Sequence, residues 1–162
     1  MADLSAVEPI GVHHLLITFD CGEAELDTWL ARHALDNHAR GFTKTYLVHR
    51  AGVVVGYYAL AMASVSREDT PANVGVRGPT KIPVALLARL GVDRNEQGYG
   101  LGAALLKDAI FRASILAEGI GARALLAHAK HETARAFYEH FDFEPSPTDP
   151  LHMYLVLEGL SP

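Results

Sequence analysis

The chain of 162 residues contains a single cysteine, Cys21, and this scarcity sets the first limits on what the protein can be. One cysteine cannot form a disulfide framework, which indicates a reducing compartment. No basic residue stands beside Cys21 to lower its pKa, so we expect a small packed side chain and not a nucleophile. The sequence also lacks an apolar run near the roughly 20 residues that span a bilayer, and it lacks a basic segment followed by an apolar core at its start. We therefore expect a cytoplasmic protein that makes no membrane contact.

Positive charge is also scarce, since the formal net charge is −5. Such a chain has no global attraction to nucleic acid, and any contact with it needs a local basic patch. The composition is 49% hydrophobic and 20% charged, which is typical of a soluble globular protein. No internal repeat or low-complexity tract interrupts it, so we predict one domain over residues 1–162.

Metal-ligand spacing is missing despite nine histidines. The pair His13-His14 and the pair His128 and His131 have no companion ligands at the spacings typical of metal sites. We therefore expect no metal ion.

The hydrophobic pattern predicts alternating strands and helices. A capping box, Asp20-Cys21-Gly22-Glu23, is expected to start the first helix, which ends near Gly41. Thr133 is a candidate cap for the last helix. The order predicts an α+β fold with one mixed sheet. The expected strands cover residues 12–18, 44–49, 53–63, 83–92, 123–129 and 153–157, and the later helices cover 103–117 and 133–140.

Residues 64–82 form the only long irregular segment that we predict. Long ordered loops in compact domains are often functional. Arg67, Arg77 and Lys81 make this one locally basic within an acidic chain, although a solvated loop with idle charges has the same appearance.

The most informative stretch is Gln97-Gly98-Tyr99-Gly100-Leu101-Gly102, which lies between an apolar strand and an amphipathic helix. The first turn of a helix has unpaired N–H donors and a partial positive charge, and glycines let a phosphate approach them. A triphosphate-binding loop would need Gly-Lys-Ser/Thr, which is absent. The glycines also fit a dinucleotide fingerprint, but the chain before them does not resemble the required βαβ unit. We interpret the stretch as a pyrophosphate site, with a tight turn that binds nothing as the alternative.

Gln97, Gly100 and Gly102 resemble the Q-x-x-G-x-G motif with which the GNAT superfamily of N-acetyltransferases binds acetyl-CoA. The resemblance implies a GNAT-like fold, in which a single central mixed sheet is flanked by helices. It also implies acetyl-CoA as the co-substrate. The cofactor-binding residues that it implies are Leu90, Val92, Gln97, Gly98, Tyr99, Gly100, Leu101, Gly102 and Phe137.

A second element, Ala134 to Phe143, is similar to the A-x-x-F-Y-x-x-x-G-F segment that closes the GNAT acetyl-CoA site. Tyr138 stands where the family's tyrosine protonates the departing CoA thiolate. A phenol of pKa near 10 is able to donate to a thiolate whose conjugate acid has a pKa near 8.5. The alternative is a tyrosine packed between helix and sheet. The sequence departs from the family at Asp142, which replaces a glycine, and at His131, which replaces an asparagine.

Further segments resemble the GNAT toxins of toxin–antitoxin pairs, over nearly the whole chain. They are Phe19 to Gly22, Leu26, Trp29-Leu30, Gly56 to Tyr58, Ile82 to Val84 and Leu90 to Asp93. This resemblance implies that the protein acetylates the α-amino group of aminoacyl-tRNA and is neutralised by a ribbon-helix-helix antitoxin. We also expect a homodimer. The candidate substrate-binding residues are Arg67, Arg77, Lys81 and Arg89.

The strand before the glycine turn offers no glutamate as a general base, only Arg89 before Asp93. Attack on a thioester needs a neutral amine. Deprotonating a lysine at pH 7 costs about 4.6 kcal/mol, whereas an α-amino group costs about 1 kcal/mol. An α-amine is therefore the more suitable nucleophile. Acetylation of a free small amine or a peptide N-terminus remains an alternative, as does a silent module that binds acyl-CoA or an antitoxin.

Overall fold

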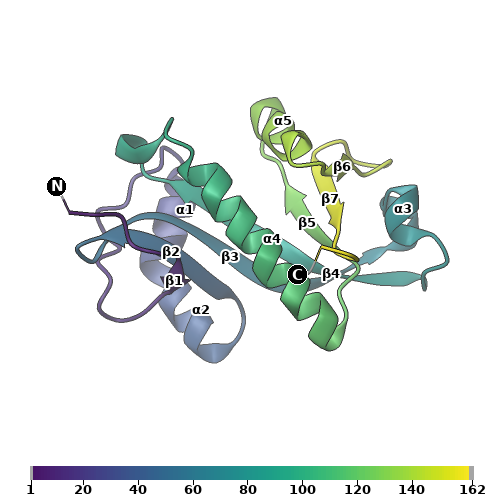
Figure 1. Cartoon of the computed structure of the whole chain (residues 1–162), viewed down its shortest axis with the longest axis horizontal. Coiled ribbons are helices and arrows are strands. Elements are labelled where there is room, and N and C mark those ends of the chain that lie inside the picture. Colours follow the sequence, from purple (N-terminus) through teal and green to yellow (C-terminus); the bar gives the residue numbers. More distant parts are fainter. Residues whose placement is uncertain (1, 161–162) are drawn as a thin grey trace. The chain divides into compact units, whose positions relative to one another are not determined.

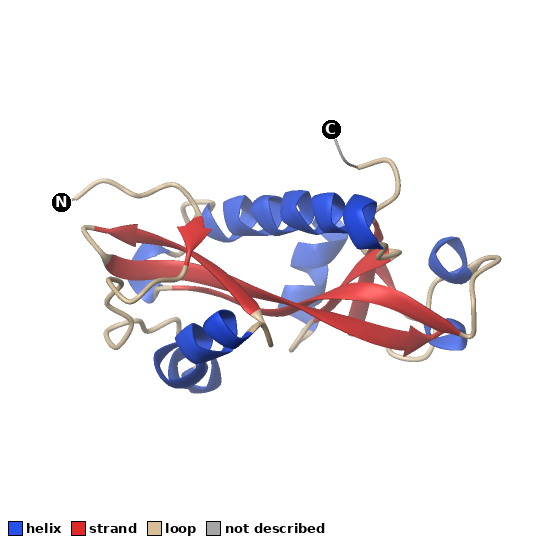
Figure 2. Cartoon of the chain, turned by 90° about the horizontal axis from the view of Figure 1, so that it is seen from below, coloured by secondary structure: helices blue, strands red, loops and turns tan. Residues whose placement is uncertain are grey.

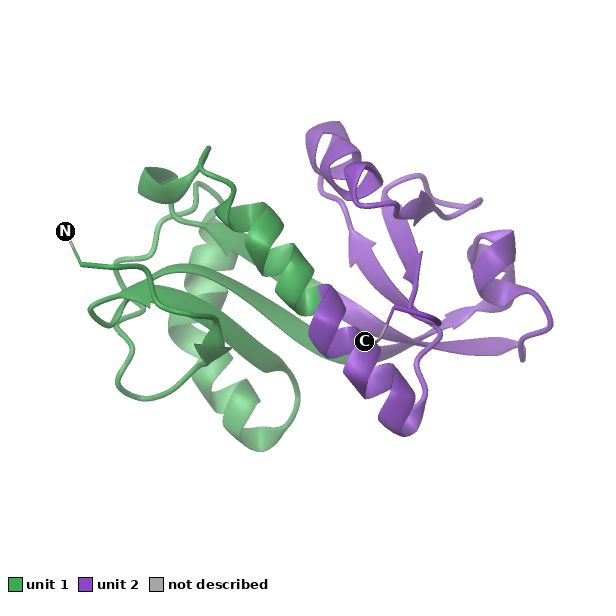
Figure 3. Ribbon diagram, viewed as in Figure 1, with its two compact units in different colours: residues 1–61, 88–109 green, residues 62–87, 110–162 purple. Residues whose placement is uncertain are grey.

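The computed structural model describes residues 2–160 of the chain. It divides into two compact units (Figure 3). Unit 1 comprises residues 1–61 and 88–109, and unit 2 comprises residues 62–87 and 110–162. Two strands and the longest helix run through both units, so neither unit is a separate stretch of chain. The prediction of a single domain stays a prediction.

Unit 1 holds the first strands and helices (Figure 1). One nearly continuous helix is formed by α1, a π-helical turn and α2, and it ends at Gly41 in the left-handed conformation. The bounds are β1 Glu8–Pro9, α1 Ala24–Trp29, the π-helix Leu30–Ala34, α2 Leu35–Arg40 and β2 Lys44–Arg50. Of the elements that both units share, β3 is Val53–Ser66, β4 is Lys81–Val92 and α4 is Leu101–Ile120, and a 3-10 turn, Arg94–Glu96, precedes α4.

Unit 2 holds the C-terminal elements and the connection between β3 and β4. That connection contains a 3-10 turn, Arg67–Asp69, and a short helix, α3 Ala72–Gly75. The remaining elements are β5 Ala124–His128, α5 Glu132–His140, β6 Glu144–Pro145 and β7 His152–Val156.

The strands form one seven-stranded mixed sheet in the order β1-β2-β3-β4-β5-β7-β6. The β4–β5 pair is parallel, from Val84↔Ala124 to Leu87↔Ala127. The pairs β1–β2, β2–β3, β5–β7 and β6–β7 are antiparallel. This confirms the predicted α+β fold with a single mixed sheet.

Adjacent residues of β3 show why helices cover both faces of the sheet in unit 1 (Figure 2). Successive side chains of a strand point to opposite faces. The Tyr57 hydroxyl donates to the carbonyl of Leu26 in α1 at 2.8 Å. The Tyr58 hydroxyl donates to the carboxylate of Asp108 in α4. Both tyrosines are fully buried, so each face buries a large apolar ring and satisfies its polar end.

A glycine in β3 sets how closely α4 packs against the sheet. A Cβ at Gly56 would lie 3.0 Å from Cδ1 of Leu105 and 3.3 Å from Cδ2 of Leu101. Since these contacts are tighter than most real Cβ contacts, Gly56 gives the start of α4 the room to lie on the strand. The glycine turn leads directly into this same end of α4.

The core of unit 2 lies between the sheet and α3. It consists of Val74, Ile82, Val84, Ala124, Leu126 and Tyr154, all buried. Arg123 closes its edge, because its guanidinium donates to the carbonyls of Val74 at 2.9 Å and Asn73 at 2.7 Å.

Four local expectations were wrong. Residues 12–18 do not form a strand; the first strand is Glu8–Pro9, which pairs with β2. The capping box fails, since Asp20 accepts from Gly22 and pairs with Arg94, and α1 begins at Ala24 without a side-chain cap.

The other two errors lie further along the chain. The irregular segment is shorter than residues 64–82, because β3 runs to Ser66, β4 begins at Lys81 and α3 lies between them. The cap of α5 is His131 and not Thr133: its Nδ1 accepts from the backbone N–H of Ala134 at 3.2 Å. Over residues 2–160, no helix is both long and apolar enough to cross a bilayer.

Candidate active site

The glycine turn lies at the N-terminus of α4, as its sequence predicted. Gly98 and Gly100 have φ of +86° and +85°, a left-handed conformation that glycine adopts without strain. A Cβ at either position would meet nothing within 4 Å, so both glycines border open space. The Tyr99 side chain between them is 86% exposed. The first N–H groups of α4 have no partner within the helix and are therefore available to an anion at this end.

Hydrogen bonds fix the turn to the segment before α1. The Gln97 side-chain Nε2 donates to the carbonyl of Cys21 at 3.0 Å and to that of Val92 at 2.8 Å. Asp93 Oδ2 accepts from the backbone N–H of Asp20 at 3.1 Å. The bonds from Gln97 to Cys21 and from Asp20 to Asp93 join residues more than 70 positions apart in the sequence, and they hold the turn in place before any ligand binds.

An ion-pair network supports the same turn from two sides. Arg94 Nε contacts Asp20 Oδ1 at 3.1 Å. Arg50 donates to both carboxylate oxygens of Glu96 at 3.0 Å, a bidentate pair. These carboxylates have pKa values below their ordinary range, chiefly because of the guanidinium hydrogen bonds. They are therefore charged at neutral pH.

Cys21 packs beside this network, as we expected. It is buried, and burial followed by the nearby Asp27 carboxylate raises the pKa of its thiol to about 12. The thiol is therefore protonated at neutral pH and is a poor nucleophile.

The predicted cofactor residues fall in both units. Leu90 and Val92 lie on β4 just before the turn, and Gln97 to Gly102 form the turn and the first residues of α4 in unit 1. Phe137 lies on α5 in unit 2, with its ring 5.4 Å from that of Tyr138. The open space at the glycines fits an anionic group, whereas the amide of Gln97 is already bonded to backbone carbonyls. Direct contact of these residues with a cofactor stays a prediction.

Tyr138 lies on α5 in unit 2 and is 8% exposed. Its ring packs against Phe143 at a centroid distance of 5.3 Å. Burial raises the pKa of its phenol to about 12, so the side chain remains a proton donor throughout the neutral range. Asp142 has φ of +69°, which shows that it takes the left-handed position expected of a glycine. The local backbone of the tyrosine segment is therefore as the sequence predicted.

Arg89 lies in unit 1, with its Cζ 4.2 Å from the centre of the Trp29 ring, a cation–π contact. The two side chains line a pocket of about 380 Å³ together with Glu25, Thr28 and His33. The Trp29 ring thereby holds the permanently charged guanidinium of Arg89 at the wall of the pocket, where it is able to contact an anion.

The other three predicted substrate residues lie in unit 2. Arg67 donates to the carbonyl of Gly78 at 2.7 Å, and Lys81 Nζ lies 3.2 Å from Ser66 Oγ. Arg77 is exposed and has φ of +60°. The structure therefore places Arg67 and Arg77 in the β3–β4 connection and Lys81 at the start of β4, all in unit 2, and Arg89 in unit 1.

A model of the acetyltransferase (GNAT) domain matches residues 41–145. The chain belongs to the GNAT acetyltransferase family. It is 49% identical to a tRNA-acetylating toxin of Mycobacterium tuberculosis over 98% of this chain and 95% of that protein. The glycine turn, the buried tyrosine and the mixed sheet are thus parts of an acetyl-CoA-dependent N-acetyltransferase.

Two solved structures share the GNAT fold over nearly the whole chain. AtaT complexed with acetyl-methionyl-tRNAfMet is 27% identical, with a TM-score of 0.89 over 98% of this chain and 97% of that one. A tyrosine-to-phenylalanine variant of the AtaT toxin, bound to acetyl-CoA and to the C-terminus of the antitoxin AtaR, is 26% identical. Its TM-score is 0.82, over 98% of this chain and 96% of that one.

Two contacts have no signal in the local sequence. The first is the contact of Gln97 with Cys21, which no local pattern signals. The second lies in unit 2, where the rings of His128 and His152 stack at a centroid distance of 4.0 Å. These two histidines stand directly opposite each other on β5 and β7, and predicting that they pair requires the register of those two strands.

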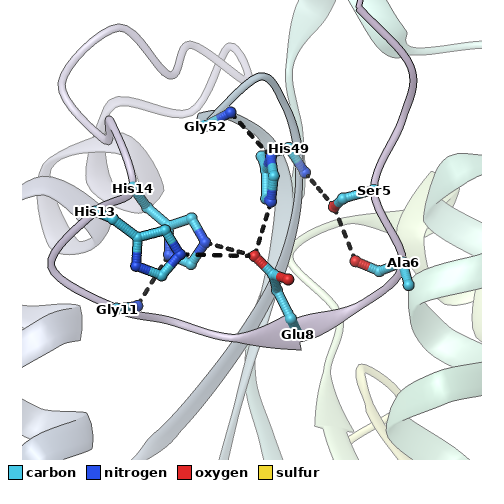
Figure 4. Close-up of polar contacts among 8 residues, drawn as sticks. All are labelled: Ser5, Ala6, Glu8, Gly11, His13, His14, His49 and Gly52. Carbon is cyan, nitrogen blue, oxygen red and sulfur yellow. Dashed lines mark hydrogen bonds and ion pairs between the residues drawn. The ribbon is translucent and has the colours of Figure 1, made fainter.

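A cluster of three histidines around Glu8 lies in unit 1 (Figure 4). The Nε2 atoms of His14 and His49 are each 2.7 Å from Glu8 Oε1, and that of His13 is 4.0 Å away. Within this cluster, Glu8, His13 and His14 offer ligand atoms that lie within 4.8 Å of one another, close enough to share an ion such as zinc.

The backbone around the Glu8 cluster indicates a different use. The N–H groups of Gly11 and Gly52 point at Nδ1 of His14 and His49, at 2.9 Å and 3.0 Å. Each Nδ1 is therefore an acceptor, which places the proton of the neutral ring on Nε2, where it is donated to Glu8. Metal binding through either Nε2 would require that proton to leave, so the observed bonds describe a carboxylate bridging two neutral histidines. The expectation of no metal stays a prediction.

Proposed function

We propose that this enzyme acetylates the α-amino group of aminoacyl-tRNA and thereby blocks translation, as the toxin of a toxin–antitoxin pair. The observation that carries the proposal is the 49% identity with the tRNA-acetylating toxin along almost the full length of both chains. An identity of that level over 98% of this chain includes the parts that bind the acceptor as well as the parts that bind acetyl-CoA.

The structural relative supports the same acceptor. AtaT was solved with acetyl-methionyl-tRNAfMet, which carries the acetyl group on an aminoacyl-tRNA, and its fold matches this chain with a TM-score of 0.89. An enzyme that forms such a product needs a site that admits the acceptor end of a tRNA. In this chain Arg89 on Trp29 and the basic residues of the β3–β4 connection are the groups we assign to its phosphates.

The energetics of the nucleophile point in the same direction. An α-amine with a pKa near 8 is partly neutral at pH 7, whereas deprotonating a lysine side chain at that pH costs about 4.6 kcal/mol. The strand before the glycine turn still offers no carboxylate before Asp93. An α-amine therefore suits this site better than a protein lysine does.

The partners we propose follow from the toxin relatives. AtaT was solved with the C-terminus of the antitoxin AtaR, and we propose that a ribbon-helix-helix antitoxin neutralises this enzyme in the same way. We further propose that the enzyme is a homodimer and acts in the cytoplasm, where its substrate is found.

A small amine or a peptide N-terminus is the second candidate acceptor. The net charge of −5 favours it. A catalytically silent module is a poorer description, because both the glycine turn and the buried tyrosine donor are intact.

The test is a direct assay of the acetyl acceptor. Purified enzyme is incubated with labelled acetyl-CoA and a pool of charged tRNA, with uncharged tRNA, a small amine and a peptide as parallel acceptors. We expect label on charged tRNA alone, recovered as N-acetyl-aminoacyl-adenosine after nuclease digestion. Label on the small amine or the peptide, with none on charged tRNA, would overturn the proposal.

A further inference from the structure

We propose that the His128 imidazole in unit 2 is the base that accepts the proton of the acceptor amine, with His152 and Asp149 as its positioning residues. The inference rests on the proposed function for the identity of the amine. The sequence supplied no base for the reaction, and the structure supplies a candidate at a position that the sequence reading had considered only as a metal ligand.

The strand register places His128 just beyond the end of the parallel β4–β5 ladder. The parallel ladder of β4 and β5 ends at Leu87↔Ala127, and His128 is the next residue of β5. Its cross-strand partner is His152 of β7. In open α/β sheets, ligands bind beyond the carboxyl ends of parallel strands. In Figure 1 the chain passes from this end of β5 into α5, the helix that carries Tyr138.

The stacked pair leaves the nitrogens of His128 unused. The two rings lie 4.0 Å apart with an interplanar angle of 11°, so they meet face to face and not through their nitrogens. His152 is held from its other side, since its Nε2 lies 3.3 Å from Asp149 Oδ2. Asp149 is itself fixed, because its Oδ1 accepts from the backbone N–H of Leu151 at 3.0 Å. In residues 2–160, neither nitrogen of His128 has a hydrogen-bond partner.

The pair lines a pocket of about 550 Å³ within unit 2. The other ionisable groups that face this pocket are Lys81, Asp69, Asp149 and Tyr154. Lys81 contacts Ser66 at 3.2 Å, and Asp69 accepts from the Thr148 hydroxyl at 2.8 Å. Since Asp149 is bonded to His152 and Leu151, each charged group has a local partner. His128 is therefore the unpartnered base of the pocket.

The protonation state of His128 suits this role. Partial burial and then the neighbouring His152 lower its pKa below 6.5, and Asp149 opposes them. At pH 7 the imidazole is therefore mostly neutral and has a free lone pair. An α-ammonium with a pKa near 8 is a weak donor to it, but the ammonium formed when the amine attacks the thioester is a far stronger acid.

The step balances without any further reactant. The amine nitrogen bonds to the acetyl carbon of acetyl-CoA, and one proton of the resulting ammonium passes to the His128 imidazole. The carbon–sulfur bond then breaks, and the Tyr138 phenol gives its proton to the leaving thiolate. The imidazolium returns its proton to water, and the phenolate takes one back.

His128→Ala tests the role, with His140→Gln as the control on the exposed end of α5. We expect the substitution at His128 to lower kcat at least about 100-fold at saturating acetyl-CoA, as for other positioned bases. Added imidazole should restore part of that loss, which a purely structural role would not allow. The control should retain wild-type kcat, since His140 is exposed and lines no pocket with His128.

The pH profile supplies a second readout that does not need a disabled enzyme. Because His152 lowers the pKa of His128, His152→Gln should move the acid limb of kcat to higher pH. An acid limb that stays in place, or a His128→Ala variant within threefold of wild type, would overturn the inference. So would a loss that imidazole does not reverse.

Failure of the proposed function is recognised separately. If wild-type enzyme acetylates a peptide or small amine and not charged tRNA, the proposed acceptor is wrong, and the His128 variants are then measured with that amine. If wild-type enzyme acetylates none of these acceptors, both proposals are overturned.

Discussion

The side-chain amide of Gln97 donates to the backbone carbonyl of Cys21 at 3.0 Å, across 76 positions of sequence. The same nitrogen donates to the carbonyl of Val92 at 2.8 Å. A residue predicted to bind the cofactor therefore has its donors committed to the protein. It joins the segment before α1 to the turn that precedes α4, and its effect on acetyl-CoA passes through the position of that turn.

Gln97→Glu should weaken both the fold and the turn. A carboxylate cannot donate to either carbonyl and is repelled by both, so we expect a loss of about 1–2 kcal/mol in the free energy of unfolding. We also expect a higher KM for acetyl-CoA with a nearly unchanged kcat. Gln97→Ala removes the hydrogen bonds without the repulsion, so its free energy of unfolding should lie between those of wild type and Gln97→Glu. An unfolding curve equal to wild type for Gln97→Glu would show that the contacts do not hold the turn.

Gly100→Asp should abolish acetyl-CoA binding, because it places a carboxylate where we expect the pyrophosphate. The matched control is Gly121→Asp at the other end of α4. Gly121 has φ of +89° and its Cβ would also meet nothing within 4 Å, so both variants carry a similar backbone strain. Calorimetric titration should show loss of binding for Gly100→Asp alone. Equal affinities for the two variants would mean that the phosphates bind elsewhere.

Tyr138→Phe should lower kcat by about 10²- to 10⁴-fold, the range for a positioned general acid. Acetyl-CoA affinity should hardly change, because the buried ring is kept. Tyr46→Phe on β2 controls for loss of a tyrosine hydroxyl elsewhere.

The pKa of Tyr138 adds a second expectation. Since it is raised to about 12, the donor form persists at all pH values below that, and wild-type kcat should show no alkaline fall up to about pH 10. A variant that keeps most of its turnover would exclude Tyr138 as the acid.

The sequence predicted the turn and the tyrosine segment because local rules decide both. Gly98 and Gly100 take positive φ, and Asp142 takes the left-handed position of the missing glycine, each within a few residues of its helix. The contacts that sequence could not supply are all long-range. The pairing of His128 with His152 depends on a strand register, and the bond from Gln97 to Cys21 depends on how two loops meet.

The predicted helix caps were wrong where another residue makes the hydrogen bond that the sequence pattern assigned to the cap, or where the expected cap residue bonds elsewhere. Asp20 has the residue type and spacing of a helix cap, but Arg94 and Gly22 occupy its carboxylate. His131 caps α5 although histidine is not among the residues preferred there, because its Nδ1 reaches Ala134. Both errors shift a boundary by a few residues and leave the element in place.

Glu8→Gln should lower thermal stability near neutral pH. The hydrogen bond from His14 is the largest cause that holds the pKa of Glu8 below 4.5; burial opposes it, and the hydrogen bond from His49 adds to it. A lowered folded-state pKa means that the carboxylate stabilises the fold above about pH 4.5, and that this contribution is lost as pH falls through the folded value. The difference in Tm between wild type and Glu8→Gln should therefore be constant from pH 7 to 5 and shrink below 4.5.

Glu118→Gln, an exposed change on α4, is the control for the Glu8 experiment and should show little difference at any pH. A Tm difference for Glu8→Gln that persists unchanged to pH 3 would mean that the bridge to the histidines does not stabilise the fold.

The last prediction concerns tRNA, for which the charge of the whole chain and the relatives point in different directions. An acidic protein binds RNA if its positive charges lie where the acceptor end must lie. Arg77→Glu and Arg89→Glu reverse one candidate in each unit, and we expect each to weaken acetylation of aminoacyl-tRNA. The wild-type kcat/KM for tRNA should fall steeply between low and physiological salt, because phosphate contacts release counterions. Each reversal should make that slope shallower, while acetyl-CoA affinity stays constant. Arg40→Glu, on the exposed end of α2, makes the same change of charge and serves as the control. If both test variants retain full activity and the salt profile is flat, the arginines do not contact phosphate, and a small amine becomes the better candidate for the natural acceptor.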